Sequence, residues 1–249
     1  MSSLLKIDGM SVSFATPRGN LRAVNDVTIE LLKGESLGVV GESGSGKTVL
    51  SRATMGLLPG TATRTGTITY NGKVISELPK DEVRELWGTG MAMIFQDPMT
   101  ALNPVRRIGS QLTESLTVRL GMDKKTAKLK AIELLKRVRI PDPESMLRKF
   151  PYQLSGGMRQ RIMIAIAVSC EPELLFADEP TTALDVTVQA QVLDLITELR
   201  KESNMAMILV THDLGVVAGH TDKIAVMYAG DVVEYAPTRQ LFSNMKMPY

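Results

Sequence analysis

The sequence predicts an α/β fold with two additions, a β-rich lobe and an inserted helical lobe. Short apolar runs at residues 174–177 and 207–210 flank a stretch of helical periodicity, which is typical of buried parallel strands joined by helices. Alternation of period two near the start of the chain indicates a half-buried strand. From about Asp97 the pattern becomes helical. Ligands of such a fold are expected at the carboxyl ends of the parallel strands.

The first part of the chain reads as strands. Residues 27–31 alternate between apolar and polar side chains, which predicts a half-buried strand. Residues 67–75 contain an Asn-Gly pair between two strand-like runs and predict a hairpin, because this pair suits a tight turn with positive φ. The apolar run at 36–40 ends in a glycine-rich loop, and helical spacing resumes from Thr48. This order predicts strand, loop, helix.

The helical lobe is predicted from apolar positions that recur with helical spacing. One stripe consists of Ile108, Leu112, Leu116 and Leu120, and a second of Ala127, Ala131, Leu134, Leu135 and Val138. We interpret the lysines at 124, 125, 128 and 130 as a solvated face rather than a binding patch. A later stripe, at residues 188–199, predicts the helix between the two apolar runs named above.

Composition limits the classes of protein that fit. A length of 249 residues suits one large domain or a domain with an inserted lobe. The net charge of +2 is too small to indicate a nucleic-acid surface. The single cysteine, Cys170, excludes an internal disulfide and is expected in the core. The start of the chain has no signal-like apolar core, and no stretch approaches the roughly 20 apolar residues of a spanning helix. We therefore expect a soluble cytosolic chain that reaches a membrane only through a partner.

A phosphate-binding loop is predicted at residues 41–48, which fit G-x-x-x-x-G-K-[ST] between a strand and a helix. Its residues are Gly41, Glu42, Ser43, Gly44, Ser45, Gly46, Lys47 and Thr48. The glycines let successive backbone N–H groups point at one anion, and the helix start adds positive potential. Lys47 is expected to reach the terminal phosphates, and the Thr48 hydroxyl is expected to ligate Mg²⁺. The alternative, a chance glycine loop, is disfavoured by this context.

Two carboxylates, Asp178 and Glu179, directly follow the apolar run at 174–177. Burying a bare carboxylate is costly, so such residues are solvated, paired or bound to metal. We interpret Asp178 as part of the Mg²⁺ shell and Glu179 as the group that orients or deprotonates the attacking water. The alternative is that the pair caps the following helix. The presence of Lys47 and Thr48 makes that interpretation the weaker one.

Two further polar residues, His212 and Gln96, lie at the ends of predicted strands. His212 follows the run at 207–210 and could hydrogen-bond the γ-phosphate or hold the attacking water. Gln96 closes a further predicted strand where the helical lobe begins, and its amide could contact Mg²⁺ or water. His220 has no such placement, and we interpret it as a surface or packing residue.

The segment LSGGMRQR, residues 154–161, predicts a second anion site. Ser155 is a good N-cap, and Gly156, Gly157 and the first N–H groups of the following helix can bind an anion. Two phosphate-binding segments in one chain make sense if each nucleotide is sandwiched between the first segment of one subunit and the second segment of another.

The sequence resembles the nucleotide-binding subunits of ATP-binding cassette (ABC) transporters. The motifs GESGSGKT, MIFQDPMTALNP, LSGGMRQR, LLFADEPTTALD and VTHDL occur in that order over nearly the whole chain. The resemblance implies a P-loop NTPase (RecA-like) core with an antiparallel β subdomain and an inserted α-helical subdomain. It implies one nucleotide-binding domain over residues 1–249. Residues 1–97 form the β-rich lobe and the phosphate-loop part of the core, residues 98–160 the helical lobe that ends at the signature, and residues 161–249 the rest of the catalytic core.

The resemblance also implies the site. ATP and Mg²⁺ are the expected cofactors, and the phosphate-binding set extends to Val49. Phe14 matches the family's adenine-stacking aromatic, with strand packing as the alternative, and Val24 is expected to flank the same base. Gln96 matches the lobe hinge, Asp185 the intersubunit loop and His212 the switch histidine. Catalytic roles fall to Glu179, His212 and Gln96, and metal contacts to Thr48, Gln96 and Asp178. Ser155, Gly156 and Gly157 match the signature segment that serves the partner's nucleotide.

Within the family, the chain looks most like the ATPase subunits of oligopeptide and dipeptide importers, and nickel and glutathione importers have similar subunits. The implied partners are a second ABC ATPase subunit, two membrane permease subunits and, indirectly, an extracytoplasmic substrate-binding protein, without nucleic acid. The second subunit is expected to be a homologous chain, with a homodimer as the alternative. The implied location is the cytoplasmic face of the cell membrane.

Two departures from the pattern matter. Met158 replaces the usual glutamine of the signature, which affects a side-chain contact but not the backbone anion site. Peptide-importer subunits typically continue past the position of Tyr249 into a cysteine-bearing tail, so we expect either a truncation or a short form, and we assign no iron–sulfur cluster.

Two rival functions fit the sequence less well. A soluble ABC ATPase that acts on DNA or ribosomes would carry long coiled coils or two cassettes, whereas Lys47 and Ser155 are only 108 positions apart and one cassette is present. A regulatory module without turnover is disfavoured because Glu179 and His212 are both present.

Overall fold

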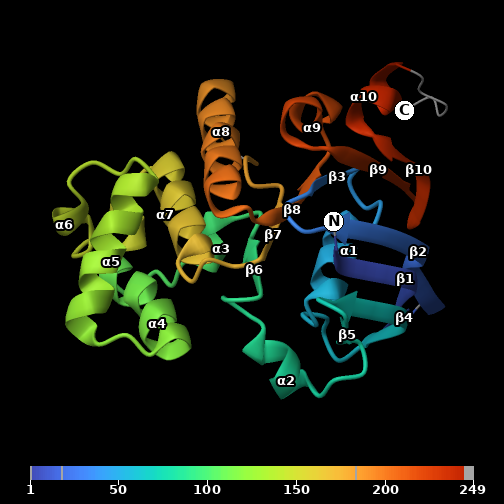
Figure 1. Ribbon diagram of the computed structural model, residues 1–249, viewed down its shortest axis with the longest axis horizontal. Helices are drawn as coiled ribbons and strands as arrows, with labels where there is room; N and C mark the ends of the chain where they lie inside the picture. Colours follow the sequence, from blue (N-terminus) through green and yellow to red (C-terminus); the bar gives the residue numbers. More distant parts are fainter. Residues whose placement is uncertain (1, 18, 183, 244–249) are drawn as a thin grey trace. The chain divides into compact units, whose positions relative to one another are not determined.

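The computed structural model describes residues 2–17, 19–182 and 184–243. The end of the chain, where we expect either a truncation or a short form, lies outside this described part. The chain divides into two compact units, Met1–Leu86 with Asn204–Tyr249 and Trp87–Ser203. The elements of both units are labelled in Figure 1.

Unit 1 contains a four-stranded antiparallel sheet in the order β2-β1-β4-β5. Its strands are β1 (Ser3–Thr16), β2 (Gly19–Leu32), β4 (Ala62–Tyr70) and β5 (Lys73–Val74). The apolar positions of the predicted strand at 27–31 are buried and the polar ones between them are exposed. Asn71 and Gly72 turn the chain with φ values of 48° and 79°, so the predicted hairpin is confirmed.

Unit 1 also contains parallel strands with helices between them. Strand β3 (Ser36–Val40) is completely buried and pairs in parallel with β8 (Ala206–Thr211) and with β9 (Lys223–Tyr228), and β10 (Asp231–Pro237) runs antiparallel to β9. The helices are α1 (Lys47–Thr54), α2 (Lys80–Glu85), α9 (Leu214–His220) and α10 (Thr238–Ser243). Because β3 and β8 are parallel, the segments that follow them emerge at the same edge.

Unit 2 pairs two parallel strands, β6 (Met91–Ile94) and β7 (Leu174–Asp178), with a group of helices. The helices are α3 (Pro98–Ala101), α4 (Ile108–Leu120), α5 (Lys124–Arg137), α6 (Pro143–Met146), η1 (Pro151–Gln153), α7 (Gly156–Val168) and α8 (Val186–Ser203). Parallel strands joined by helices, together with a separate antiparallel sheet, confirm the predicted α/β class.

The helical stripes are buried with one exception. Every member of the two predicted stripes is at most 1% exposed except Leu120, which is 40% exposed. Leu120 is the last residue of α4, and Gly121 follows it with a φ of 64°. The expectation that Leu120 continues the buried stripe is wrong, and α4 ends at this residue.

The lone cysteine lies where the sequence predicts. Cys170 follows α7 and is 6% exposed, and burial raises the pKa of its thiol. A raised thiol pKa disfavours the reactive thiolate, which fits a packing role.

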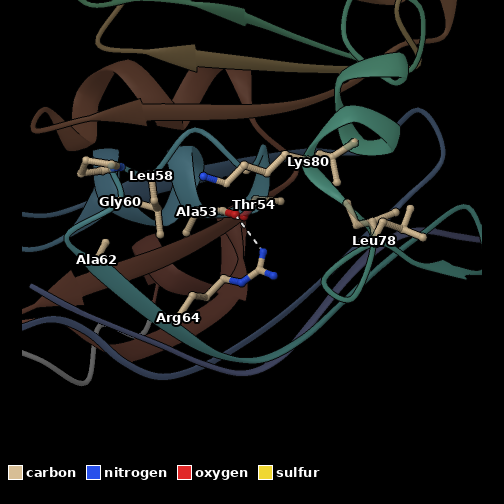
Figure 2. A pocket seen from close by; sticks show the side chains of 12 residues that line it. Ala53, Thr54, Leu58, Gly60, Ala62, Arg64, Leu78 and Lys80 are labelled. Carbon is tan, nitrogen blue, oxygen red and sulfur yellow. Dashed lines mark hydrogen bonds between the residues drawn. The ribbon is translucent and has the colours of Figure 1, made fainter.

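A pocket of about 310 Å³ lies at the C-terminal end of α1 in unit 1. Arg64 reaches into it from β4 (Figure 2), and its guanidinium donates hydrogen bonds to the carbonyl oxygens of Ala53, at 3.4 Å, and of Ser76, at 2.6 Å. Burial lowers the pKa of Arg64. Since the last carbonyls of a helix have no partner within the helix, Arg64 acts as a C-terminal cap of α1.

Replacing Arg64 by methionine should lower the free energy of unfolding by about 1–3 kcal/mol, because two carbonyl groups lose a charged donor. Urea unfolding measures this change. Arg52→Met, at an exposed position in the last turn of the same helix, is the control and should change stability by less than about 0.5 kcal/mol. Equal midpoints for the two variants would remove Arg64 from the capping role.

Candidate functional site

The glycine-rich loop of unit 1 lies between the end of β3 and the start of α1, as predicted. Gly44 and Gly46 have φ values of 83° and 102°, a region that favours glycine. A Cβ atom on Gly41 would collide with the carbonyl oxygen of Met227, and one on Gly46 would collide with that of Ala23. Glycine is therefore required at 41 and 46 because the backbone of other segments packs directly against the loop.

Lys47 is the first residue of α1 and is 5% exposed. Its ammonium group donates hydrogen bonds to the carbonyl oxygens of Gly41, at 2.7 Å, and Glu42, at 2.8 Å, and lies 3.5 Å from the Ser45 hydroxyl. The charge is thus held inside the curl of the loop, beside the N-terminus of a helix. This arrangement places positive charge where a phosphate-binding loop needs it.

The other predicted loop residues fall into two groups. Glu42 and Ser43 are exposed, and Thr48 and Val49 are partly exposed on the first turn of α1. All four therefore lie at the surface around the loop.

Phe14 and Val24 differ in exposure. Phe14 is partly exposed on β1 and pairs with Leu21 of β2 and Ala62 of β4. Val24 lies on β2 and is completely buried. Burial disfavours the expected contact between Val24 and a base, whereas the partial exposure of Phe14 is compatible with one.

His212 directly follows β8 and is exposed, so its predicted placement at a strand end is confirmed. Strands β3 and β8 are parallel neighbours in which Val40 lies opposite Thr211. The phosphate loop and His212 therefore follow adjacent strands at one edge of unit 1. His220 is the last residue of α9 and is partly buried, as expected for a packing residue.

In unit 2, Asp178 is the last residue of β7 and is 1% exposed. Glu179 follows it with a φ of 45°. The alternative that this pair caps the next helix is wrong, because α8 begins at Val186. Asp185 is the cap instead, and its carboxylate accepts a hydrogen bond of 3.0 Å from the backbone N–H of Val188.

Two side chains bind the carboxylate of Glu179. The amide Nε2 of Gln96 donates to its Oε2 at 3.0 Å, and the Thr182 hydroxyl donates to the same oxygen at 2.9 Å. Gln96 lies two residues beyond the end of β6, and Ile94 pairs with Ala177 in the parallel ladder, which brings the two segments together. Sequence reasoning missed Thr182, for which the only available signal was its place three residues after Glu179.

The signature segment forms the start of α7. Ser155 is the N-cap, and its hydroxyl accepts a hydrogen bond of 3.4 Å from the N–H of Met158. Gly156 is exposed and Gly157 partly exposed. The first N–H groups of a helix lack partners within the helix, so this start retains the properties of an anion site.

A buried glutamine of α7 was also missed. Gln160 is 1% exposed, and its Nε2 donates to the carbonyl oxygen of Pro180. Gln189 of α8 donates to the carbonyl oxygen of Thr181 at 3.2 Å. Helices on both sides thus hold the loop that follows Glu179.

The described residues contain no group of three or more histidine, cysteine, aspartate or glutamate side chains arranged to hold a metal. The predicted metal contacts are instead a hydroxyl, an amide and a carboxylate, from Thr48, Gln96 and Asp178. Oxygen donors of this kind suit Mg²⁺, which is commonly held by one or two protein groups together with phosphate oxygens and water.

A phosphate-binding loop between a buried strand and a helix, with an acidic pair after another buried strand, defines a P-loop nucleotide-binding protein. The antiparallel sheet of unit 1 and the helices of unit 2 are its additional subdomains. The predicted fold is therefore confirmed at this level.

Comparison with known proteins identifies the family. The family model described as ABC transporter matches residues 24–182. The dimeric structure of MJ0796, a bacterial ABC transporter cassette, has a TM-score of 0.85 and 25% sequence identity over 95% of this chain and 99% of that one. The chain belongs to the ABC transporter family, and it is an ATP-binding ATPase of that family.

Curated relatives match over nearly the whole chain. The oligopeptide transport ATP-binding protein OppD of Salmonella typhimurium is 50% identical over 99% of this chain and 73% of its own length. The dipeptide transport ATP-binding protein DppD of Bacillus subtilis is 47% identical over 100% of this chain and 75% of its own length. The resemblance to peptide-importer subunits is thus confirmed. Within the described part of the chain, each helix is too short or too polar to cross a membrane.

Proposed function

We propose that this chain is the ATP-hydrolysing subunit of an importer for dipeptides or oligopeptides. The observation that carries the proposal is the identity of about half of all residues to peptide transport ATP-binding proteins, over nearly the full chain. The five motifs occur in the order expected for a complete nucleotide-binding domain, which we assign to residues 1–249. The cargo binds to other subunits, so the choice between dipeptides and oligopeptides is not made by this chain.

Nucleotide binding falls to the phosphate loop in this proposal. Lys47 and the loop N–H groups bind the β- and γ-phosphates, and Phe14 stacks on the adenine. Mg²⁺, when bound, neutralises charge on the phosphate oxygens. Thr48, Asp178 and Gln96 would supply its oxygen donors.

Hydrolysis falls to Glu179, which orients or deprotonates the attacking water. The hydrogen bonds from Gln96 and Thr182 to one carboxylate oxygen fix the orientation of the group. His212 donates a hydrogen bond to the γ-phosphate. Phosphoryl transfer depends mainly on positioning and charge stabilisation, so groups held in this way account for the chemistry.

Two subunits close head to tail on ATP in this mechanism. Ser155, Gly156 and Gly157 of one subunit bind the γ-phosphate on the other, and Asp185 contacts the neighbouring subunit. The second subunit is a homologous ATPase or a second copy of this chain. The helices of unit 2 transmit the closing movement of the two ATPase subunits to two membrane permease subunits. The permease subunits receive cargo from an extracytoplasmic binding protein. The chain then sits at the cytoplasmic face of the membrane, without nucleic acid.

Reconstitution tests this function. The chain is co-expressed with permease and partner ATPase subunits, placed in proteoliposomes and supplied with a peptide-loaded binding protein. The expected result is ATP-dependent uptake of labelled peptide and stimulation of ATP turnover by the loaded receptor. Co-purification with nucleic acid or ribosomes, with no stimulation by the receptor, would favour the soluble ABC ATPase instead.

A further inference from the structure

Gln160 is a polar residue in the interior of unit 2. It lies on α7 just before the buried residues Ile162, Met163 and Ile164, and it is itself 1% exposed. Burying an amide without a hydrogen-bond partner is costly, so its bond to the carbonyl oxygen of Pro180 is a strong constraint on both groups.

The group that Gln160 binds lies next to the catalytic carboxylate. Pro180 directly follows Glu179, and its ring restricts φ to about −65°. Glu179 itself has a φ of 45°. Of the two backbone rotations of Pro180 only ψ is free, so part of a displacement of its carbonyl group is passed to Glu179, whose carboxylate Gln96 and Thr182 bind.

Gln160 also lies one helical turn from the signature glycines. Gly156 and Gln160 are four residues apart on α7, so a shift of the helix start reaches Gln160 through continuous helical backbone. A close approach between two helices also supports this route. The backbone of Gly157 lies so near Val188 of α8 that a Cβ atom added to Gly157 would be 3.2 Å from the Val188 side chain. Gln189 of α8 in turn holds the Thr181 carbonyl.

We propose that Gln160 is a positioning residue that couples the anion site at the start of α7 to the carboxylate of Glu179 in the same chain. The inference rests on the head-to-tail arrangement of the proposed function. In that arrangement the start of α7 serves the partner's nucleotide, whereas Glu179 serves the chain's own nucleotide. Gln160 thus links the two nucleotides, and binding of one adjusts the carboxylate that hydrolyses the other.

The test replaces Gln160 by methionine, which has similar length and no donor, in the assembled transporter. Turnover should fall by about 10- to 100-fold, since a misplacement of about 1 Å costs up to that much, while the KM for ATP stays within about twofold. Gln160→Asn, which keeps the amide but withdraws it by one methylene, should fall between the wild type and Gln160→Met. An intermediate turnover of Gln160→Asn would show that the loss in Gln160→Met follows the position of the amide and is not caused by misfolding alone.

Gln111→Met is the matched control. Gln111 lies on α4, and its Nε2 also donates to loop carbonyls in unit 2, those of Asn103 and Arg106, both at 3.0 Å. Its loss removes the same kind of bond away from Glu179. Basal turnover should remain at the wild-type level.

Hydrogen exchange separates coupling from a purely structural role. With the non-hydrolysable analogue AMP-PNP, wild-type protein should show added protection at both 154–161 and 179–185. In Gln160→Met the first segment should remain protected and the second should lose its added protection. Wild-type turnover, or protection of both segments in this variant, would overturn the coupling alone. Absence of protection at 154–161 in the wild-type complex would instead count against the proposed head-to-tail function.

Discussion

Glu179→Gln is expected to bind ATP as tightly as the wild type and to hydrolyse it at least about 100-fold more slowly. Glutamine preserves the shape of the side chain and can still interact with Gln96 and Thr182, but it cannot accept a proton from the attacking water. Equilibrium binding of a fluorescent ATP analogue and steady-state phosphate release measure the two effects separately.

Glu173→Gln is the matched control for this experiment. Glu173 is exposed and immediately precedes β7, whereas Glu179 follows the other end of the same strand. The control should retain wild-type turnover. Normal steady-state hydrolysis by Glu179→Gln would remove Glu179 from its assigned role.

Lys47→Ala is expected to weaken ATP binding by about 10- to 100-fold, because a charge-assisted hydrogen bond to phosphate contributes about 1.5–3 kcal/mol. Titration with the same fluorescent analogue measures the affinity. Lys47 also bonds to the carbonyls of Gly41 and Glu42, so thermal unfolding of the variant must be compared with that of the wild type.

Lys73→Ala serves as the control for Lys47. Lys73 belongs to the same unit, is exposed and lies 3.7 Å from a carboxylate oxygen of Glu82. Its replacement should leave ATP affinity unchanged. If Lys47→Ala is folded and binds ATP as tightly as this control, the ammonium group does not contact the phosphates.

Much of the fold follows from local sequence patterns. The Asn71-Gly72 turn, the buried run of β3 and the N-cap at Ser155 each depend on residues adjacent in the chain, and each was predictable for that reason. The exposure of Leu120 was not predictable from its stripe, since periodicity identifies a helix face but not the residue at which neighbouring elements stop covering it.

The site was predictable where chemistry is tied to a linear motif. Residues 41–48 have the spacing of a phosphate-binding loop, and the acidic pair at 178 and 179 follows an apolar run as expected for carboxylates near a metal. Thr182 and Gln160 lacked such a signal, because their contacts with Glu179 and Pro180 are hydrogen bonds that form only in the folded loop. Glutamine side chains are mostly exposed in folded proteins, so the burial of Gln160 could not be expected from its residue type.

The left-handed backbone at Glu179 sets folding stability against the catalytic role that we propose for this residue. A residue other than glycine in this region of φ costs on the order of 1–3 kcal/mol. Glycine would relieve that cost and would also delete the carboxylate. If Glu179 has the proposed role, selection for thermal stability alone would favour glycine at this position and would give a more stable protein without ATPase activity.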